Sequence, residues 1–420
     1  MTAAAQQAAA PQHDDLAARK YERRAIFSSA LGHSLDGLDL LILGFAMSGI
    51  ISTFGVSQTV AGSLTTITLF GALVGGLLFG VLSDRLGRVK VLTYSVIFFA
   101  VFTGLTALAP NFEMVAVFRF LAGVGIGAEF GIGMTLAAEA ARPGHRARAT
   151  SWVGIGFQCG VLVAALTSAP IIGAFGWRGL FAVGVIPAVI AIVIRLTLPE
   201  SRVFLENAGK AQQEPGKTSS RILALFANRR IATTSIAMII LTTVQNFGYF
   251  GIMTWLPSYL SKQRELSLTS TGVWTAVTVL GMMLGIVVFG QIADRIGRRP
   301  AFWIFQVGAA VSVLVYSQLT TETSLLIGGF VMGMFANGML GGYGALLAEL
   351  YPTRIRATAQ NVLYNTGRFI GGGLGPIVIA ALATDHGFAY ALALLPAIYL
   401  IAFVTMFLIP DKKGKELDHA

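Results

Sequence analysis

The sequence predicts an all-α membrane protein with twelve transmembrane helices in two six-helix bundles. Three observations predict it: low charge, repeated apolar runs and a charged motif that occurs twice. Hydrophobic residues make up 55% of the 420 residues and charged residues only 12%, too few to cover a soluble surface. Runs of about 20 apolar residues, enough to cross about 30 Å of hydrocarbon, recur along the chain.

Twelve such runs can be placed, and each must be helical because lipid cannot satisfy unpaired backbone groups. They are 25–51, 58–83, 89–109, 112–140, 149–174, 179–198, 229–260, 268–293, 300–319, 322–350, 357–383 and 387–410. The polar stretch between the sixth and seventh contains Pro199, Gln212 and Pro215 and interrupts the pattern. We therefore expect five segments: a cytoplasmic tail (1–24), a bundle (25–198), a cytoplasmic linker (199–228), a second bundle (229–410) and a cytoplasmic tail (411–420).

The basic residues fix an expected orientation. Lys and Arg concentrate in alternate gaps between the apolar runs, at 19–24, 85–90, 142–148, 202–230, 295–299, 354–356 and 412–415. The other gaps hold only Arg178, Lys262 and Arg264. This positive-inside pattern puts both termini in the cytoplasm, with the protein in the cell inner or plasma membrane. It also explains the net charge of +10 without a nucleic-acid partner.

The sequence gives little support to an enzyme. Cys159 is the only cysteine and the five histidines are scattered, so neither a zinc cluster nor a serine–histidine arrangement is apparent. The first 20 residues lack an apolar core and a cleavage pattern, so we expect a tail and not a signal peptide. We expect no organic cofactor and no metal.

A charged motif occurs twice in the same setting. Gly80-Val-Leu-Ser-Asp84-Arg85-Leu-Gly87-Arg88 matches the segment from Gly290 to Arg299, 210 positions later, and Glu139 matches Glu349 at the same offset. Arg146-Ala-Arg148-Ala-Thr150 resembles Arg354-Ile-Arg356-Ala-Thr358. Motifs repeated in order at half the chain length indicate a duplicated bundle, the architecture of many secondary transporters.

These residues resemble the major facilitator superfamily over essentially the whole chain. The Gly-x-x-x-Asp-Arg-x-Gly-Arg loop and its copy are that superfamily's signature. The resemblance implies that these charged residues form cytoplasmic networks that latch the outward-facing state and do not touch substrate. The residues expected in this gating role are Asp84, Arg85, Arg88, Glu139, Asp294, Arg295, Arg298, Glu349 and Arg356.

A narrower resemblance is to organic acid:proton symporters. Asp36-Gly-Leu-Asp39 is similar to the Asp-Gly-x-Asp motif of aromatic acid carriers, and Gly127-Ala-Glu129 is close to the Gly-Gly-Glu of sialate and monocarboxylate carriers. The two motifs point to different branches and therefore to an acid rather than to one particular acid. The proline expected soon after the first motif is absent, as is the Gly-Pro-rich helix 5 motif of drug:proton antiporters.

Ionisable residues inside the bilayer cost at least about 2.5 kcal/mol each and are functional candidates. Asp36 and Asp39 lie near the middle of helix 1, three residues apart and so on one face. Two carboxylates this close cannot both ionise cheaply, so one is expected to bind and release the coupling proton. Asp39 is slightly favoured as that residue. The alternative is a pair that only packs helices or binds water.

Two further residues lie deep in helix 4. Glu129 is expected to be a second proton or substrate site, the alternative being a hydrogen bond that only stabilises the helix. Arg119 must have a partner because it stays charged, and Asp39 or Asp36 is plausible. It would serve as their counter-ion or bind the substrate anion.

Helix 11 carries a polar stripe of Asn361, Tyr364, Asn365 and Arg368. A guanidinium beside amide and phenol groups suits bidentate capture of a carboxylate; the alternative is an interhelical hydrogen-bond stripe. At the offset of 210, Arg368 corresponds to Gln158. Weaker pocket candidates are Gln158, Gln245, Asn246, Tyr249, Asn337 and Tyr343. His33 is expected to be a satisfied hydrogen-bonding residue rather than a member of a proton path.

The prediction is a monomeric, proton-coupled symporter that imports a small organic acid anion by alternating access. An aromatic carboxylate or another monocarboxylate is the expected substrate, with the lipid bilayer as the other partner. The alternatives are a proton-antiport exporter of small molecules and a transporter-like sensor that does not transport.

Overall fold

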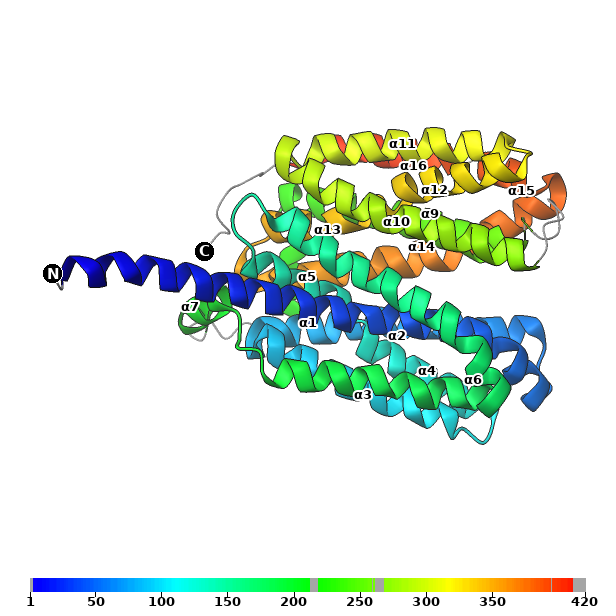
Figure 1. Ribbon diagram of the computed structural model, residues 1–420, viewed down its shortest axis with the longest axis horizontal. Helices are drawn as coiled ribbons and strands as arrows, with labels where there is room; N and C mark the ends of the chain where they lie inside the picture. The colour runs from blue at the N-terminus through cyan, green and yellow to red at the C-terminus, as the bar shows by residue number, and fades with distance from the viewer. Residues whose placement is uncertain (1–2, 212–217, 259, 261–267, 394, 411–420) are drawn as a thin grey trace.

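The computed structural model describes residues 3–211, 218–258, 260, 268–393 and 395–410. It is almost entirely helical, and twelve of its helical segments are long and apolar enough to cross a membrane. Figure 1 shows them as two side-by-side bundles, one formed by the first half of the chain and one by the second. The predicted fold class is confirmed, and the protein is an integral membrane protein.

The first bundle is built from six helices. They are α1 (Ala3–Phe54), α2 (Gln58–Leu86), α3 (Arg88–Ala107), α4 (Phe112–Ile126), α5 (Glu129–Ala140) and α6 (Arg146–Leu196). Gly176 has φ +66° and ψ −174°, so α6 consists of two spans joined at a sharp turn. The helices α4 and α5 together form one span, which bends just before Glu129.

The connecting segment and the second bundle are also helical in the described residues. The connection contains α7 (Arg202–Ala211), α8 (Thr218–Leu223) and η1 (Ala224–Phe226). The second bundle contains α9 (Arg229–Ser258), α10 (Leu268–Ile296), α11 (Arg298–Gln318), α12 (Glu322–Gly338), α13 (Leu340–Leu350), η3 (Thr353–Ile355), α14 (Arg356–His386), α15 (Phe388–Ala393), α16 (Leu395–Thr405) and η4 (Met406–Leu408).

The helix α1 differs from its predicted bounds. We expected a tail up to residue 24 and a helix from 25, but α1 runs unbroken from Ala3 to Phe54. Figure 1 shows it projecting beyond the bundles at the left. The expected basic residues Lys262 and Arg264, the segment 412–415 and the tail 411–420 lie outside the described residues.

Small residues allow helices of one bundle to touch backbone to backbone. A Cβ placed on Gly75 of α2 would lie 1.9 Å from the carbonyl oxygen of Val124 in α4. A Cβ on Gly285 of α10 would lie 2.0 Å from that of Met334 in α12. Both pairs are related by the 210-residue offset, so the duplication extends to helix packing and not only to the charged loops.

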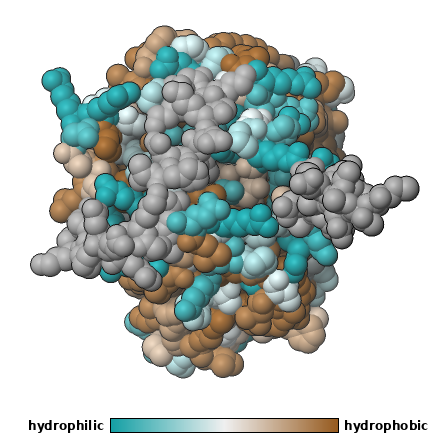
Figure 2. Space-filling model, turned by 90° about the vertical axis from the view of Figure 1, so that its left-hand side faces the viewer, coloured by the Kyte–Doolittle hydropathy of each residue, from teal (hydrophilic) through white to brown (hydrophobic). Residues whose placement is uncertain are grey.

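The end of the molecule that carries the repeated charged motifs is called the charged end here. It lies at the left of Figure 1, where α2 leads into α3 and α6 leads into α7. Figure 2 looks onto this end and shows hydrophilic side chains there, whereas apolar residues cover the flanks of the molecule. This distribution suits a protein whose flanks face lipid and whose end faces water.

Candidate functional site

An ion pair joins the two bundles deep inside the protein. Arg368 of α14 donates through Nη1 to Oδ2 of Asp36 at 2.6 Å and through Nη2 to Oδ1 at 2.7 Å. The side chains are 5% and 0% exposed. A two-pronged guanidinium–carboxylate contact is geometrically specific and strong. Because Asp36 is in α1, this contact must change whenever the bundles move apart at this depth.

Asp39 has a separate arginine partner. Arg119 of α4 donates through Nη1 to Oδ1 of Asp39 at 2.9 Å and through Nη2 to Oδ2. Both residues are buried and belong to the first bundle. The expectation that Arg119 pairs with Asp39 or Asp36 is therefore met by Asp39. We expected repulsion between Asp36 and Asp39 to make one of them bind a proton. In the structure each carboxylate is instead neutralised by its own arginine.

Glu129 also forms a buried ion pair, with an arginine that the sequence reasoning did not single out. Arg195 near the end of α6 contacts both Glu129 oxygens, at 3.0 and 2.6 Å, and Ser95 donates to Oε1 at 3.1 Å. Arg195 also donates to the carbonyl of Leu92 at 2.9 Å. Sequence reasoning missed Arg195 because it lies close to the basic residues of a loop. The available signal was that Arg195 lies inside the predicted apolar run 179–198, where a charged residue needs a partner.

A cavity of about 20 Å³ lies between the bundles beside Arg368. Six of the predicted binding residues line it, namely Arg368, Tyr364, Gln245, Asn246, Tyr249 and Asn337, together with His33, Phe157, Phe250 and Leu340. A volume of this size holds about one water molecule. In this conformation the cavity is therefore too small for an organic solute and must widen to admit one.

Two neighbouring amides leave a donor and an acceptor available at this cavity. Gln245 donates to the side-chain oxygen of Asn337 at 2.9 Å and to the carbonyl of Ala336 at 3.2 Å. Within the described part of the chain, Gln245 Oε1 and Asn337 Nδ2 have no hydrogen-bond partner. Buried polar groups of this kind are normally satisfied by water or a ligand.

Apart from Arg119, which pairs with Asp39, four predicted binding residues do not line the cavity. Asn365 donates to the carbonyl of Gly127 in the other bundle at 2.9 Å. Asn361 donates to the carbonyl of Ala357 one turn earlier on its own helix and packs against Gly131 of α5, where an added Cβ would lie 2.4 Å from it. Tyr343 donates to the carbonyl of Leu241 at 3.0 Å inside the second bundle. These three match the alternative that polar residues here stabilise helix contacts.

The fourth, Gln158, lies next to the cavity and not in its wall. Its Nε2 donates to the sulfur of Met282 at 3.1 Å, and the Tyr249 hydroxyl donates to its Oε1 at 3.5 Å. At the offset of 210, Gln158 corresponds to Arg368 and Asn246 to Asp36. The charged pair takes one residue from each half, and the two positions related to it by the offset, again one in each half, carry neutral amides.

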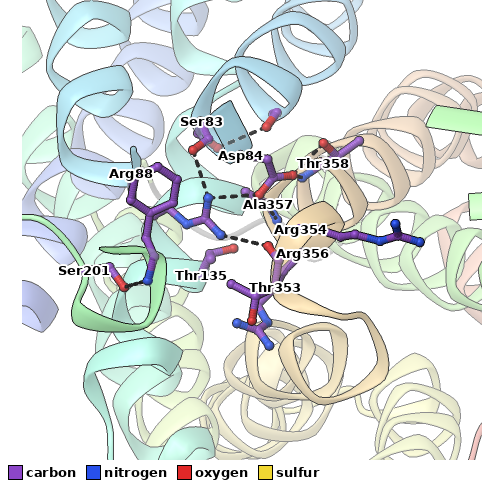
Figure 3. Close-up of polar contacts among 12 residues, drawn as sticks. Ser83, Asp84, Arg88, Thr135, Ser201, Thr353, Arg354, Arg356, Ala357 and Thr358 are labelled. Atoms are coloured by element: carbon purple, nitrogen blue, oxygen red, sulfur yellow. Dashed lines mark hydrogen bonds and ion pairs between the residues drawn. The ribbon is translucent and has the colours of Figure 1, made fainter. Parts of the chain in front are cut away.

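The first repeated motif caps a helix of the opposite bundle. Asp84 of α2 accepts hydrogen bonds from the backbone of Ala357 at 3.3 Å and of Thr358 at 2.8 Å, at the start of α14. The residue before α14, Ile355, cannot cap it. Figure 3 shows Asp84 directed at this helix end with Arg88 beside it. The carboxylate supplies both the missing cap and the charge favoured at a helix N-terminus.

The second motif repeats this arrangement in the other direction. Asp294 of α10 accepts from the backbone of Ala147 at 3.1 Å and of Arg148 at 3.0 Å, at the start of α6. The residue before α6 is His145, whose side chain makes no cap bond. Each bundle thus caps one helix of its partner.

Buried ion pairs reinforce both caps. Arg88 contacts Asp84 at 3.0 Å and Glu139 at 3.2 Å, and Arg356 reaches Glu139 at 2.9 Å. In the second copy the corresponding contacts are Arg298–Asp294 at 2.8 Å, Arg298–Glu349 at 2.7 Å and Arg146–Glu349 at 3.5 Å. Arg85 and Arg295 are exposed at the same turns.

The contacts correct the alignment of one repeat. We matched Arg146-Ala-Arg148-Ala-Thr150 with the segment that begins at Arg354, which is an offset of 208. In the structure Arg146 plays the part of Arg356, because each starts a helix and reaches a glutamate of its partner motif. A strict offset of 210 would have given this assignment.

The connecting segment adds contacts that the sequence reasoning missed. Glu200 accepts from the backbone N–H of Arg88 at 2.8 Å and of Val89 at 3.1 Å, so it caps α3, while Ser201 donates to Glu139 at 2.5 Å. Arg221 of α8 donates to the carbonyl of Arg354 at 3.2 Å. Partial burial lowers the pKa of Arg221 from its ordinary value, which leaves it cationic at neutral pH.

His33 does not behave as expected. It is fully buried, and neither ring nitrogen has a hydrogen-bond partner among the residues that the structure describes. Its Nδ1 lies 3.8 Å from Oδ2 of Asp36. The hydrogen bond expected at His33 is therefore not made to any protein group that the structure describes. As to metals, the described residues contain no group of three His, Cys, Asp or Glu side chains suited to hold an ion.

Comparison with known proteins agrees with the fold and the repeated motifs. The sequence profile of the Major Facilitator Superfamily matches residues 29–276 and 259–419. A relative from Haemophilus influenzae, named for metabolite transport, is 51% identical over 95% of this chain and 98% of its own.

Other relatives are named for particular solutes. One from Cupriavidus pinatubonensis, named for 4-methylmuconolactone transport, is 31% identical over 95% of this chain and 92% of its own. A cis,cis-muconate transport protein from Acinetobacter baylyi is 29% identical over 90% of this chain and 92% of its own. Among solved structures, the proton:xylose symporter XylE superposes with a TM-score of 0.78 at 19% identity, covering 95% of this chain and 98% of its own.

Proposed function

The chain belongs to the Major Facilitator Superfamily and is a transporter rather than an enzyme, and on this premise we propose that it is a proton-coupled symporter that imports a small organic acid anion. The observation that carries the proposal is the buried Asp36–Arg368 ion pair between the bundles. A carboxylate already occupies the arginine that would hold a carboxylate substrate.

Charge balance then couples the proton to the anion. If a proton reached Asp36 alone, Arg368 would be left as an unpaired buried cation, and breaking such a pair costs about 3–5 kcal/mol. If the anion arrived alone, two carboxylates would share one guanidinium. When both arrive, Asp36 is neutral, the anion takes its place on Arg368, and the net charge of the site is unchanged.

The same pair links binding to movement. Asp36 and Arg368 lie on opposite bundles, so the ion pair resists their separation, whereas an anion held by Arg368 while Asp36 is neutral removes that resistance. The Asp39–Arg119 and Glu129–Arg195 pairs lie within the first bundle and would move with it as a unit. They are structural supports in this proposal, although Glu129 and Asp39 were predicted to handle protons.

The cavity lining supports a small acid with a flat or unsaturated body. Aromatic rings of Phe157, Tyr249, Phe250 and Tyr364 line the cavity together with Arg368, and the Gln245–Asn337 pair offers one donor and one acceptor. A carboxylate on Arg368 with apolar atoms against the rings fits this lining. Benzoate, a monoanion, preserves this charge balance and is the natural first probe; cis,cis-muconate, for which one relative is named, is the second.

The orientation follows from the positive charges of the connecting loops. The charged end would face the cytoplasm, with both termini there and the protein in the inner or plasma membrane. Both helix caps and their ion pairs are formed at that end, which corresponds to a state closed toward the cytoplasm. Opening toward the cytoplasm would break both caps together.

The test is uptake by purified protein in liposomes. Labelled benzoate, cis,cis-muconate, nicotinate, N-acetylneuraminate and lactate would be offered with the lumen at pH 7.5 and the outside at pH 5.5 or 7.5. The proposal expects concentrative uptake of at least one acid only with the acidic outside, abolished by Arg368→Gln. Uptake at the same rate with and without the pH gradient, or a preference for a neutral sugar such as xylose, would contradict the proposal. Counterflow without a gradient distinguishes a transporter from a sensor.

A further inference from the structure

Polar groups without partners line one face of α1 between the central ion pair and the charged end. His33 precedes Asp36 by three residues and Ser29 precedes His33 by four, so all three share a face of the helix. The His33 nitrogens, the Ser29 hydroxyl and the Tyr21 hydroxyl, two turns further on, are buried and have no hydrogen-bond partner among the described residues.

The unsatisfied groups differ from their neighbours on the same helix. Ser34, on another face of α1, donates to the carbonyl of Leu31 at 2.6 Å and is satisfied locally. An unsatisfied buried polar group costs about 1–3 kcal/mol, and such groups are normally satisfied by buried water. A row of them predicts a file of water molecules along this face.

His33 is placed to connect that file to Asp36. Its ring lies between Phe130 of α5 and Phe157 of α6, with ring centroids at 5.4 and 5.2 Å. The charged groups near it are Asp36 on its own helix and Arg368 on α14. Since Nδ1 is 3.8 Å from the Asp36 oxygen, a small movement of the ring brings the two atoms within hydrogen-bond distance.

We propose that His33 transfers the coupling proton from Asp36 to water along α1 on its way to the charged end. The O–H bond of protonated Asp36 breaks and an N–H bond forms at one ring nitrogen. The other ring nitrogen gives up a proton to water beside Ser29, so one proton moves and the histidine stays neutral. A second transfer or a ring rotation restores the starting tautomer. The inference rests on the proposed function and adds the release route.

The test separates net proton-driven uptake from exchange. His33→Gln protein would be placed in liposomes, with labelled benzoate and cis,cis-muconate as probes and a trapped pH indicator reporting protons. Exchange of internal for external label can proceed without releasing the proton, whereas net uptake cannot. In the variant, net uptake and luminal acidification are expected to fall at least tenfold further than exchange does. His145→Gln, an exposed histidine in a loop, is the matched control and should behave like the wild type.

Two further variants test the path beyond the histidine. Ser29→Ala should slow net uptake but not exchange, and Ser34→Ala should slow neither. Net uptake by His33→Gln at the wild-type rate would overturn the relay. So would equal losses of exchange and net uptake, because they would make His33 a binding or structural residue. A wild-type protein with exchange but no proton-driven uptake would instead refute the proposed function, and the relay with it.

Discussion

Replacing Asp36 by Asn tests the central ion pair most informatively. The substitution keeps the shape of the side chain and removes its charge, which leaves Arg368 buried with no anion. Breaking a buried pair from one side costs about 3–5 kcal/mol, so Asp36→Asn should be less stable than the wild type by that amount. The loss should show as a lower unfolding temperature in detergent.

The same change should raise affinity for the substrate anion. Arg368 no longer has a competing carboxylate, and an anion that satisfies it regains part of the 3–5 kcal/mol. At 1.4 kcal/mol per tenfold, the limit is about two to three orders of magnitude in Kd. Thermal shift against cis,cis-muconate and benzoate should therefore show greater stabilisation in the variant. Uptake driven by an acidic exterior should be lost while exchange persists.

The positions related to this pair by the offset of 210 supply the control. The positions that correspond to Asp36 and Arg368 are Asn246 and Gln158, so Asp36→Asn with Arg368→Gln gives the first pair the neutral side chains of the second. This double variant should recover most of the lost stability and bind no anion. If Asp36→Asn were as stable as the wild type, or if the double variant were less stable than the single one, the ion-pair reasoning would be refuted.

Three other changes follow from the geometry. Gly32→Ala should lower the free energy of unfolding by about 1–3 kcal/mol, because the added Cβ would lie 1.8 Å from Nη2 of Arg195 and displace its buried contact with Glu129. As a control, the Cβ of Gly44→Ala on the same helix would meet nothing within 4 Å, so this variant should unfold like the wild type or be slightly more stable. Asp39→Asn should also lower the free energy of unfolding by about 3–5 kcal/mol. Because the Asp39–Arg119 pair lies within one bundle, the number of protons transported per substrate should stay unchanged in flux measurements. A changed ratio would show that Asp39 takes part in proton coupling. Asp84→Ala removes the cap on α14, worth about 0.5–2 kcal/mol, together with the buried contact between Asp84 and Arg88. A cysteine introduced in the cavity of a Cys159→Ser background should then react faster with a maleimide applied from the cytoplasmic side, and an unchanged rate would argue against a gating role.

Sequence reasoning reached the fold because lipid leaves the backbone few choices. Apolar length determines a span and charged loops determine its ends, so the helices and the repeated motifs could be placed without coordinates. The junctions were less accessible. The start of α1 and the bend between α4 and α5 depend on propensity and packing, which hydropathy does not record.

The site was predicted residue by residue but not as pairs. Asp36, Asp39, Glu129, Arg119 and Arg368 stand out because each is ionisable within an apolar run. Which carboxylate meets which arginine depends on how helices far apart in the chain pack, and the offset of 210 relates equivalent positions rather than contacting ones. The polar residues of helix 11 therefore have two different roles. Tyr364 and Arg368 line the cavity, whereas Asn361 and Asn365 pack between helices.

Proton uptake on anion binding tests the central claim most directly. Purified protein in weakly buffered detergent at pH 7 would be titrated with the transported anion while a pH indicator reports protons taken up. The account predicts that the wild type takes up close to one proton for each anion bound and that Asp36→Asn takes up none. Anion binding to the wild type without proton uptake, or undiminished uptake in the variant, would contradict it.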